Sequence, residues 1–119
     1  MKVLIIGGGA SGFFSAISCA QNNAEVEVTL LEKSNKLLSK VKISGGGRCN
    51  VTHAAFENHQ LIKNYPRGNN DLKKLFTFFS VEDTVKFFED RGVKIKEEKD
   101  GRMFPFSDDS QTIIDCLVK

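Results

Sequence analysis

The sequence has little of what several classes of protein require. Its three cysteines are an odd number without short-range pairing, which argues against a disulfide framework and favours a reducing cytoplasm. No apolar run approaches the roughly 18–20 residues of a membrane-spanning helix, and the short N-terminal run ends in glycines, unlike a signal peptide. Seventeen Lys and Arg against fifteen Asp and Glu give a net charge of +2, too weak to indicate nucleic acid or a membrane surface. We expect a cytoplasmic protein with neither of these partners.

Histidine and tryptophan are also scarce. His53 and His59 have no cysteines nearby and match no recognised zinc pattern, so no metal site is expected. The acidic pairs at 97–98 and 108–109 are typical of solvated edges and helix caps rather than of a catalytic carboxylate pair. The chain has ten phenylalanines and no tryptophan, and the phenylalanines between 76 and 88 predict a Phe-rich core there.

Residues 1–32 have the pattern of a βαβ unit. The apolar run 2–6 predicts a strand buried on both faces, as in a parallel sheet. Apolar residues at helical spacing predict a helix from Ala10 to about Asn23, and residues 25–32 predict a second strand. A right-handed crossover should join the two parallel strands.

The remainder predicts helices and a short hairpin. Residues 33–70 are mostly irregular in pattern, and 71–79 predict a short helix. Ser80 should cap the next helix, which runs to Arg91 before Gly92. Strands at 93–97 and 103–106 flank an Asp-Gly hairpin turn. Ser107 or Asp108 should then cap a last helix, whose predicted apolar face comprises Ile113, Ile114, Leu117 and Val118.

The predicted fold class is α/β with a Rossmann-like unit at the N-terminus. Only two long buried strands are predicted, whereas a doubly wound sheet usually has five or six. The last helix runs to Lys119 without a stop signal. We therefore expect an incomplete part of a larger fold, and the alternative is a small complete domain whose last helix frays at its end.

The turn after the first strand carries a dinucleotide fingerprint. Gly7, Gly9 and Gly12 fit G-x-G-x-x-G between a strand and a helix. Their expected tasks are the tight turn, the approach of a pyrophosphate to the backbone and close packing of helix on strand. Glu32 ends the second strand, where its carboxylate can accept hydrogen bonds from ribose hydroxyls and would repel a 2′-phosphate. This pattern suits FAD and NAD equally and argues against NADP at this site.

A second cluster runs from Gly45 to Asn50. Three consecutive glycines are entropically costly and make sense where backbone lies against a flat ligand or a phosphate. Arg48 could pair with phosphate, and Asn50 could bond a ring or the backbone. Cys49 has no second cysteine close by, which favours a non-redox role. Residues 33–48 include five cations and no acid after Glu32, predicting a basic collar near a diphosphate, although Lys33, Lys36 and Lys40 are individually better explained as solvated.

Together, the glycine turn, the Leu30–Lys33 strand end and the block Lys42–Thr52 resemble the BaiN/YhiN-like bacterial flavoproteins. The stretches 87–93 and 101–107 resemble the same family, so the resemblance covers essentially the whole chain. One departure is His53, where the family usually has Asn; it lies close enough to the glycine cluster to touch a cofactor. Family members are much longer, so further sheet, a second domain and a closing segment would lie beyond residue 119.

The resemblance implies an FAD-dependent, NAD(P)H-linked oxidoreductase. Residues 1–119 would be the N-terminal portion of its FAD-binding domain, comprising the βαβ unit 1–32, a cofactor-contacting region 33–70, and helices with a short hairpin over 71–119. The expected cofactor-binding residues are Gly7, Gly9, Ala10, Ser11, Gly12, Glu32, Lys33, Lys42, Ser44, Gly45, Gly46, Gly47, Arg48, Cys49 and Asn50. No catalytic acid or base can be assigned.

Three hypotheses for function remain open. The leading one passes hydride from NAD(P)H through FAD to a small organic acceptor, with the cofactor carrying the chemistry. The second is an NAD-binding Rossmann domain. The third is a non-catalytic chain that binds no cofactor and is inactive on its own. Oligomeric state and substrate are not encoded in any recognisable pattern.

Overall fold

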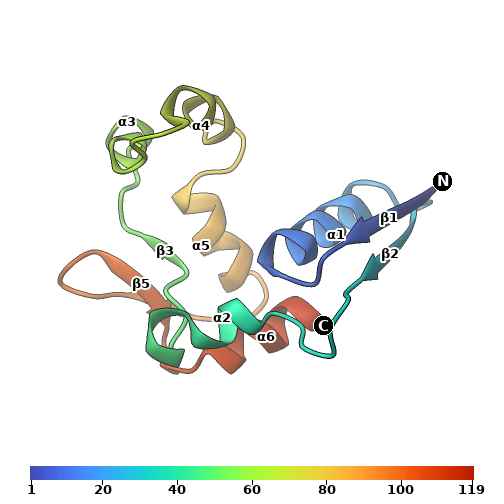
Figure 1. Ribbon diagram of the computed structural model, residues 1–119. Helices are drawn as coiled ribbons and strands as arrows, with labels where there is room; N and C mark the ends of the chain where they lie inside the picture. The colour runs from blue at the N-terminus through green and yellow to red at the C-terminus, as the bar shows by residue number, and fades with distance from the viewer.

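The computed structural model describes residues 1–119 and contains two separate sheets (Figure 1). Strands β1 (Lys2–Ile6) and β2 (Glu27–Leu31) are parallel and in register, with Lys2 opposite Glu27 and Ile6 opposite Leu31. Helix α1 (Ala10–Asn22) connects them. The predicted βαβ unit is therefore confirmed, with boundaries within two residues of those expected from the sequence.

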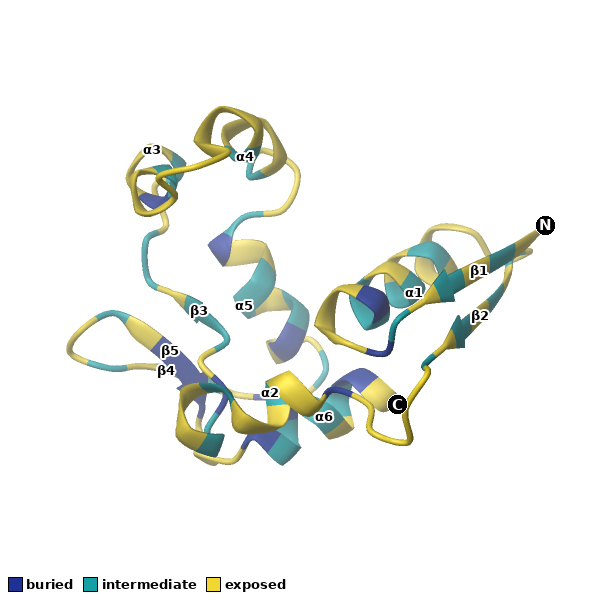
Figure 2. Cartoon of the chain, viewed as in Figure 1, coloured by how far each residue is buried: buried dark blue, intermediate teal, exposed yellow.

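The β1–β2 sheet is covered on one face only, so the prediction of a strand buried on both faces is wrong. Alternate residues, Leu30 among them, face α1 and are half-buried. On the opposite face Leu4, Ile6 and Leu31 are 59%, 82% and 50% exposed. The physical reason is that α1 is the only helix packed on this pair of strands, and Figure 2 shows the exposed strands beside it.

The segment 33–70 is not mostly irregular, contrary to its pattern. Leu38 is buried in the core and adopts a left-handed conformation (φ 52°) from which α2 starts. Short elements then follow one another as α2 (Ser39–Ile43), the 3-10 helix η1 (Ser44–Gly47), β3 (Thr52–His53), α3 (Asn58–Leu61) and the 3-10 helix η2 (Ile62–Asn64). Each is too short to leave a clear hydrophobic period in the sequence.

Two longer helices follow. Helix α4 (Asn69–Leu75) begins and ends earlier than the predicted 71–79, because Gly68 at φ 73° starts it. Helix α5 (Val81–Glu89) begins where predicted. The Ser80 hydroxyl accepts from the Asp83 backbone N–H, and the Asp83 carboxylate accepts from the Ser80 N–H, forming a capping box. Gly92, at φ 81°, turns the chain out of this helix.

A small antiparallel sheet in the order β3-β5-β4 comes next. Strands β4 (Ile95–Glu97) and β5 (Arg102–Pro105) form the predicted hairpin. Helix α6 (Ser110–Val118) is capped by Asp109, whose carboxylate accepts from the Gln111 N–H at 2.8 Å, and not by Ser107 or Asp108 as predicted. Ile113 and Leu117 are buried on α6 as expected, but Val118 is exposed.

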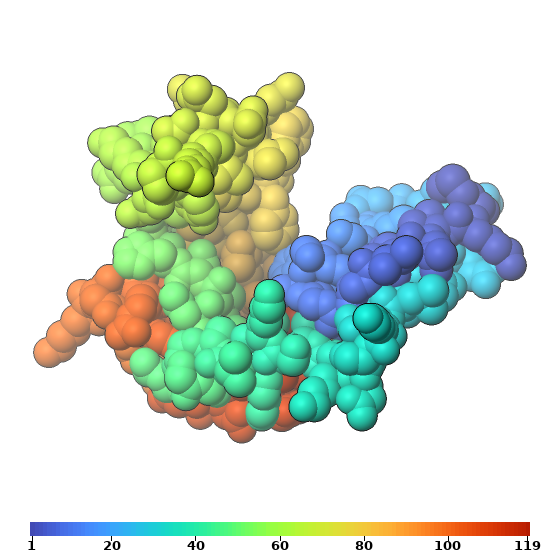
Figure 3. Space-filling model, in the orientation of Figure 1, coloured from blue at the N-terminus to red at the C-terminus, as the bar shows by residue number.

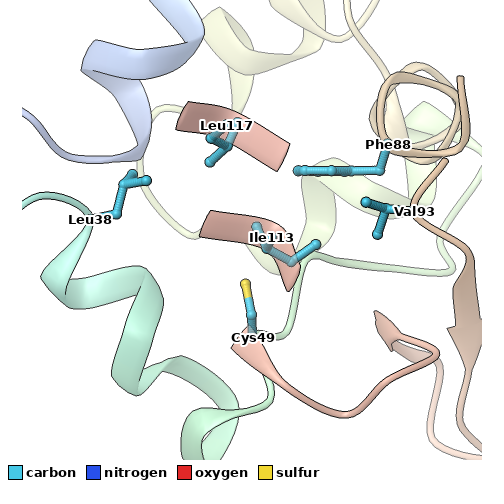
Figure 4. Packing of buried hydrophobic residues seen from close by; sticks show 6 residues of the cluster. All are labelled: Leu38, Cys49, Phe88, Val93, Ile113 and Leu117. Atoms are coloured by element: carbon cyan, nitrogen blue, oxygen red, sulfur yellow. The ribbon is translucent and has the colours of Figure 1, made fainter. Parts of the chain in front are cut away.

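The main core lies between α1, α2, α5 and α6. Figure 4 shows its buried members converging from these elements and their neighbours, namely Leu38, Cys49, Phe88, Val93, Ile113 and Leu117. Phe14 of α1 joins this core by stacking on Phe87, with ring centroids 4.6 Å apart. The predicted Phe-rich core is only partly correct, because Phe78 and Phe79 are exposed.

The βαβ unit extends away from the rest of the chain as an arm (Figure 3). The principal extents of the molecule are 42 × 32 × 26 Å, which makes it elongated. None of its helices combines the length and the apolar character needed to cross a membrane. The arm and the body meet near the N-terminus of α1, and this is where the predicted ligand-binding residues lie.

Candidate cofactor site

The glycine turn between β1 and α1 combines three different backbone requirements. Gly7 has φ 112°, and its N–H donates to the Leu31 carbonyl at 2.7 Å, extending the β1–β2 ladder. A Cβ at Gly12 would lie 1.9 Å from the Gly7 carbonyl oxygen, so only glycine allows α1 to pack this closely. A Cβ at Gly9 would meet no protein atom within 4 Å. Protein packing therefore leaves the space above Gly9 free for a ligand.

The N-terminus of α1 offers unused hydrogen-bond donors beside Gly9. No side chain caps this helix, although the Gly9 carbonyl accepts from the Phe13 N–H at 3.1 Å. The N–H groups of Ala10, Ser11 and Gly12 find no acceptor within the protein. Free N–H groups and the positive end of the helix dipole favour an anion at this position.

Glu32 is held against the glycine turn. Its Oε2 accepts from the Gly8 N–H at 2.8 Å, and its Oε1 accepts from the Ser34 N–H at 2.8 Å. These backbone donors, Ser34 first and then Gly8, lower the pKa of the Glu32 carboxyl below its ordinary value. The group is ionised at neutral pH, and each oxygen keeps a lone pair that can accept from a hydroxyl.

Glu32 and the glycine turn open on one pocket of about 540 Å³, here named the glycine-turn pocket. The loop after β2 also lines this pocket. It is held to the glycine turn by the Leu38 N–H, which donates to the Gly8 carbonyl at 2.8 Å. Lys36 and Lys40 also line the pocket, so the structure brings two cations to a site for a phosphate-bearing ligand. The lining residues are Gly8, Gly9, Ala10, Ser11, Glu32, Ser34, Lys36, Leu38, Ser39, Lys40 and Val41.

A second, mostly apolar pocket of about 280 Å³ adjoins the first and is named the apolar pocket. The two pockets share Ala10, Lys40 and Val41 in their walls, so they lie next to each other. Eight of the twelve lining residues of the apolar pocket are hydrophobic, and five of these eight come from α1, α5 and α6. The lining residues are Ala10, Phe14, Lys40, Val41, Ser44, Cys49, Asn50, Val51, Thr84, Phe88, Ile113 and Leu117.

The turn Ser44–Asn50 forms part of the apolar pocket through only three of its residues, Ser44, Cys49 and Asn50. Its three glycines have φ values of 56°, 68° and 88°, which are left-handed conformations that favour glycine. Gly45 is further restricted, because a Cβ there would lie 2.8 Å from the Asn50 backbone nitrogen and 2.8 Å from the Phe104 ring. The chain path thus requires these glycines, and none of them lines either pocket.

Cys49 and Asn50 anchor the end of this turn. Cys49 is buried at φ 61°, its N–H donates to the Ser44 carbonyl at 3.0 Å, and burial raises the pKa of its thiol. A buried thiol that favours the protonated state fits packing rather than redox chemistry. The Asn50 amide, with its nitrogen toward the backbone, donates to the Thr52 and Met103 carbonyl oxygens at 2.8 and 3.2 Å.

The match to a family model covers the whole chain. The model of the HI0933-like protein Rossmann domain matches residues 1–119. The chain belongs to the HI0933-like family. This family includes the BaiN/YhiN proteins, so the resemblance carried by the glycine turn and by the Lys42–Thr52 block is confirmed.

Two relatives show similarity across nearly all of the HI0933-like domain. A 3-dehydro-bile acid delta(4,6)-reductase of Clostridium scindens is 32% identical over 117 residues, which is 98% of this chain and 27% of that protein. A ribosomal RNA dihydrouridine synthase of Escherichia coli is 31% identical over 115 residues, which is 97% of this chain and 27% of that protein. The domain thus spans about a quarter of the length of these relatives. The prediction that nucleic acid is not a partner is not confirmed, because the Escherichia coli relative is named for a reaction on ribosomal RNA.

Several predicted site residues of the HI0933-like domain lie outside both pockets. Arg48 Nη1 is 2.5 Å from Glu98 Oε1, and Lys42 Nζ is 3.0 Å from Gln111 Oε1. Lys33 is exposed and lines neither pocket. His53 packs over the hairpin turn, where a Cβ on Gly101 would lie 2.7 Å from its Nε2. The basic collar is thus divided, with only Lys36 and Lys40 beside the glycine turn.

Sequence reasoning missed mainly the contribution of α2. Their sequence context favours solvated positions for Lys36 and Lys40, yet both line the glycine-turn pocket. Lys40 lies in α2 between the two pockets. The signal in the sequence is Leu38, an apolar residue within a basic stretch. Its side chain is buried in the core, and its N–H bonds to Gly8, so that α2 begins beside the glycine turn.

Proposed function

We propose that the HI0933-like domain binds FAD. The observation that carries this proposal is that the glycine-turn pocket and the apolar pocket are adjacent, with Ala10, Lys40 and Val41 in the walls of both. A dinucleotide with a large flat ring needs a polar section for its diphosphate and an apolar section for the ring. The two pockets have these characters in the order that FAD requires.

The residues present fit the ADP half of the cofactor. The free N–H groups at the start of α1 suit a diphosphate, and Lys40 adds a cation beside them. The open space at Gly9 lets a phosphate approach the backbone. Glu32 would accept hydrogen bonds from the adenosine ribose. The predicted contacts Gly9, Ala10, Ser11 and Glu32 therefore retain this role in the proposal.

The apolar pocket would hold the flavin side of the cofactor. Phe14 and Phe88 offer aromatic surface, while Ser44 and Asn50 add polar atoms that can orient a ring. Such walls exclude water from a bound ring and fix its position, and these are the tasks of protein side chains in a cofactor enzyme. Cys49 would contribute packing and no redox step.

The activity we propose for the protein carrying this domain is a flavin-dependent reduction. Bound FAD supplies the capacity to accept hydride from NAD(P)H and to pass it to an organic acceptor. The two relatives support such an acceptor, since one is named as a reductase of a bile acid derivative and the other as a synthase of dihydrouridine in ribosomal RNA.

The experiment that tests cofactor choice is a set of separate titrations of the chain with FAD, FMN, ADP and NADH, followed by absorbance and calorimetry. We expect FAD to bind more tightly than ADP, because only FAD fills both pockets. FMN lacks the AMP half and serves as a control that should bind more weakly than FAD. Tighter binding of NADH than of FAD would support the NAD-binding alternative, and binding of none would support the non-catalytic one.

A further inference from the structure

A cluster of charged side chains joins the Ser44–Asn50 turn to the β4–β5 hairpin. We name it the Phe104 charge cluster, and its members are Arg48, Lys96, Glu98, Arg102 and Asp108. Arg48 is its centre, with Nη1 2.5 Å from Glu98 Oε1 and 3.4 Å from Asp108 Oδ1. These partners lie 50 and 60 residues further along the chain. The cluster therefore makes a long-range connection.

The cluster lies on an aromatic ring that is itself fully buried. The Arg48 guanidinium carbon is 3.9 Å from the Phe104 ring centroid, and the Arg102 guanidinium carbon is 5.5 Å from it. The Arg48 and Glu98 side chains are only 32% and 30% exposed. An isolated exposed ion pair adds little stability, but a partly desolvated network stacked on a ring is a stronger constraint.

Phe104 contacts the turn at a second point, at Gly45. The site of a Gly45 Cβ is 2.8 Å from the Phe104 ring, and the Val51 N–H after the turn donates to the Met103 carbonyl at 2.8 Å. The turn is thus held to β5 at its beginning, at Arg48 and at its end. Its backbone needs such support, because Cys49 and three glycines all have positive φ.

We propose that Arg48 is a positioning residue that holds the Ser44–Asn50 turn on the hairpin, and that it is not a ligand of the cofactor phosphates. The guanidinium already contacts the Glu98 carboxylate and the Phe104 ring on the hairpin, and the Asp108 carboxylate just after it. By fixing the turn, it keeps Ser44, Cys49 and Asn50 in the wall of the apolar pocket before any ligand arrives. The consequence for ligand binding rests on the proposed function.

The first test measures the turn itself without any ligand. Arg48→Gln removes the positive charge of the Arg48–Glu98 ion pair, and Glu98→Gln removes its negative charge. Arg91→Gln is the matched control, because the Arg91 guanidinium stacks on Phe87 at 3.7 Å but lies outside the cluster. Alkylation of Cys49 by N-ethylmaleimide is followed by peptide mass spectrometry, with Cys19 as the internal reference. We expect both cluster variants to raise the alkylation rate of Cys49 by about tenfold, because each loses one charge-assisted hydrogen bond. Arg91→Gln should leave this rate unchanged.

The second test compares FAD with ADP for the same variants. Loss of positioning should weaken FAD in Arg48→Gln and Glu98→Gln alike and leave ADP unchanged, because ADP reaches only the glycine-turn pocket. Weaker binding of both nucleotides in Arg48→Gln, with no change in Glu98→Gln, would show a direct phosphate contact and overturn the proposal. An unchanged Cys49 rate in both cluster variants would also overturn it. If the parent chain binds neither nucleotide, the proposed function fails, and the alkylation rates still decide whether Arg48 holds the turn.

Discussion

Gly9 and Gly12 belong to one motif but are glycine for different physical reasons. At Gly12 the reason is internal, because a Cβ would lie 1.9 Å from the Gly7 carbonyl oxygen. At Gly9 no protein atom lies within 4 Å of a Cβ, and its φ of −90° suits any residue. The fold therefore accounts for Gly12, whereas the proposed ligand accounts for Gly9.

Stability measurements should separate these two glycines. We expect Gly12→Ala to lower the free energy of unfolding by about 3 kcal/mol, because the added methyl group forces α1 away from the strand. Gly9→Ala should cost about 1 kcal/mol or less, the difference between glycine and alanine at a helix N-cap. Urea unfolding followed by circular dichroism gives both values. Equal losses in the two variants would contradict this account of the turn.

Glu32 should make stability depend on pH in a defined direction. Its folded pKa is lowered by the Ser34 and Gly8 N–H groups, so its contribution is present above the ordinary glutamate pKa of about 4.3 and is lost as pH falls through the lower folded value. The gap in unfolding free energy between the parent chain and Glu32→Gln should thus be largest at neutral pH and shrink in acid. Asp71→Asn, on the exposed first turn of α4, is the control. A gap that widens in acid would refute this linkage.

At this scale the sequence predicts residues whose task is local. The spacing of Gly7, Gly9 and Gly12 is set by one turn, and Glu32 follows from the end of one strand. Arg48 and Lys40 could not be assigned in this way. The partner of Arg48 is 50 residues distant, and Lys40 reaches the pocket only because Leu38 inserts into a core assembled from other elements.

Among the elements, α5 has the best-defined start. The sequence predicts Ser80 as its cap, and the structure adds a reciprocal bond from Asp83, so that two backbone N–H groups are satisfied. Helix α6 shows the limit of such patterns, because 107–110 offers four candidate caps in a row, Ser-Asp-Asp-Ser. Packing decides among them by burying Ser110, whose hydroxyl donates to the Lys42 carbonyl at 2.8 Å.

Removing the α5 cap should have a measurable cost. We expect Ser80→Ala to lower the free energy of unfolding by about 1 kcal/mol, because the Asp83 N–H loses its acceptor. Ser15→Ala is the control, because Ser15 is exposed on α1 and its hydroxyl makes no hydrogen bond within the protein. Urea unfolding of both variants tests the difference. A loss in Ser15→Ala as large as that in Ser80→Ala would contradict the role of the cap.

The elements β1 and β2 show what an apolar pattern can and cannot predict. The sequence predicts two parallel strands, and their pairing is confirmed. The pattern in β1 is a continuous apolar run. It also predicts burial on both faces, which fails because α1 covers only one of them. An apolar sequence indicates that a strand would be stable when buried. Whether it is buried depends on which other elements pack against each face of the sheet.

In the whole molecule, Phe14 joins the βαβ arm to the body. Its ring contacts Phe79, Phe87 and Phe88, with centroid distances of 6.1, 4.6 and 6.2 Å. It also lines the apolar pocket. Together with Phe13 and Ile17 of α1, which also pack against the main core, Phe14 holds α1 beside α5.

Truncation of Phe14 should therefore loosen the arm. We expect Phe14→Ala to lower the free energy of unfolding by about 2 kcal/mol, less than for a fully buried phenylalanine because the ring is half-exposed. Hydrogen exchange should show weaker protection of the α1 amides. Phe78→Ala is the matched control, since that ring is 74% exposed and its loss should change stability by about 0.5 kcal/mol at most. Unchanged α1 protection in Phe14→Ala would contradict this role.

The central claim, that the glycine turn binds the ADP half of a dinucleotide, is tested most directly by calorimetric titration of ADP into the parent chain and into Gly9→Ala. A methyl group at Gly9 would occupy the space proposed for a phosphate without touching the protein. We expect the parent chain to bind ADP and Gly9→Ala to lose most of this affinity while keeping its fold by circular dichroism. Equal affinity of the two folded proteins for ADP, or no binding by the parent chain, would contradict it.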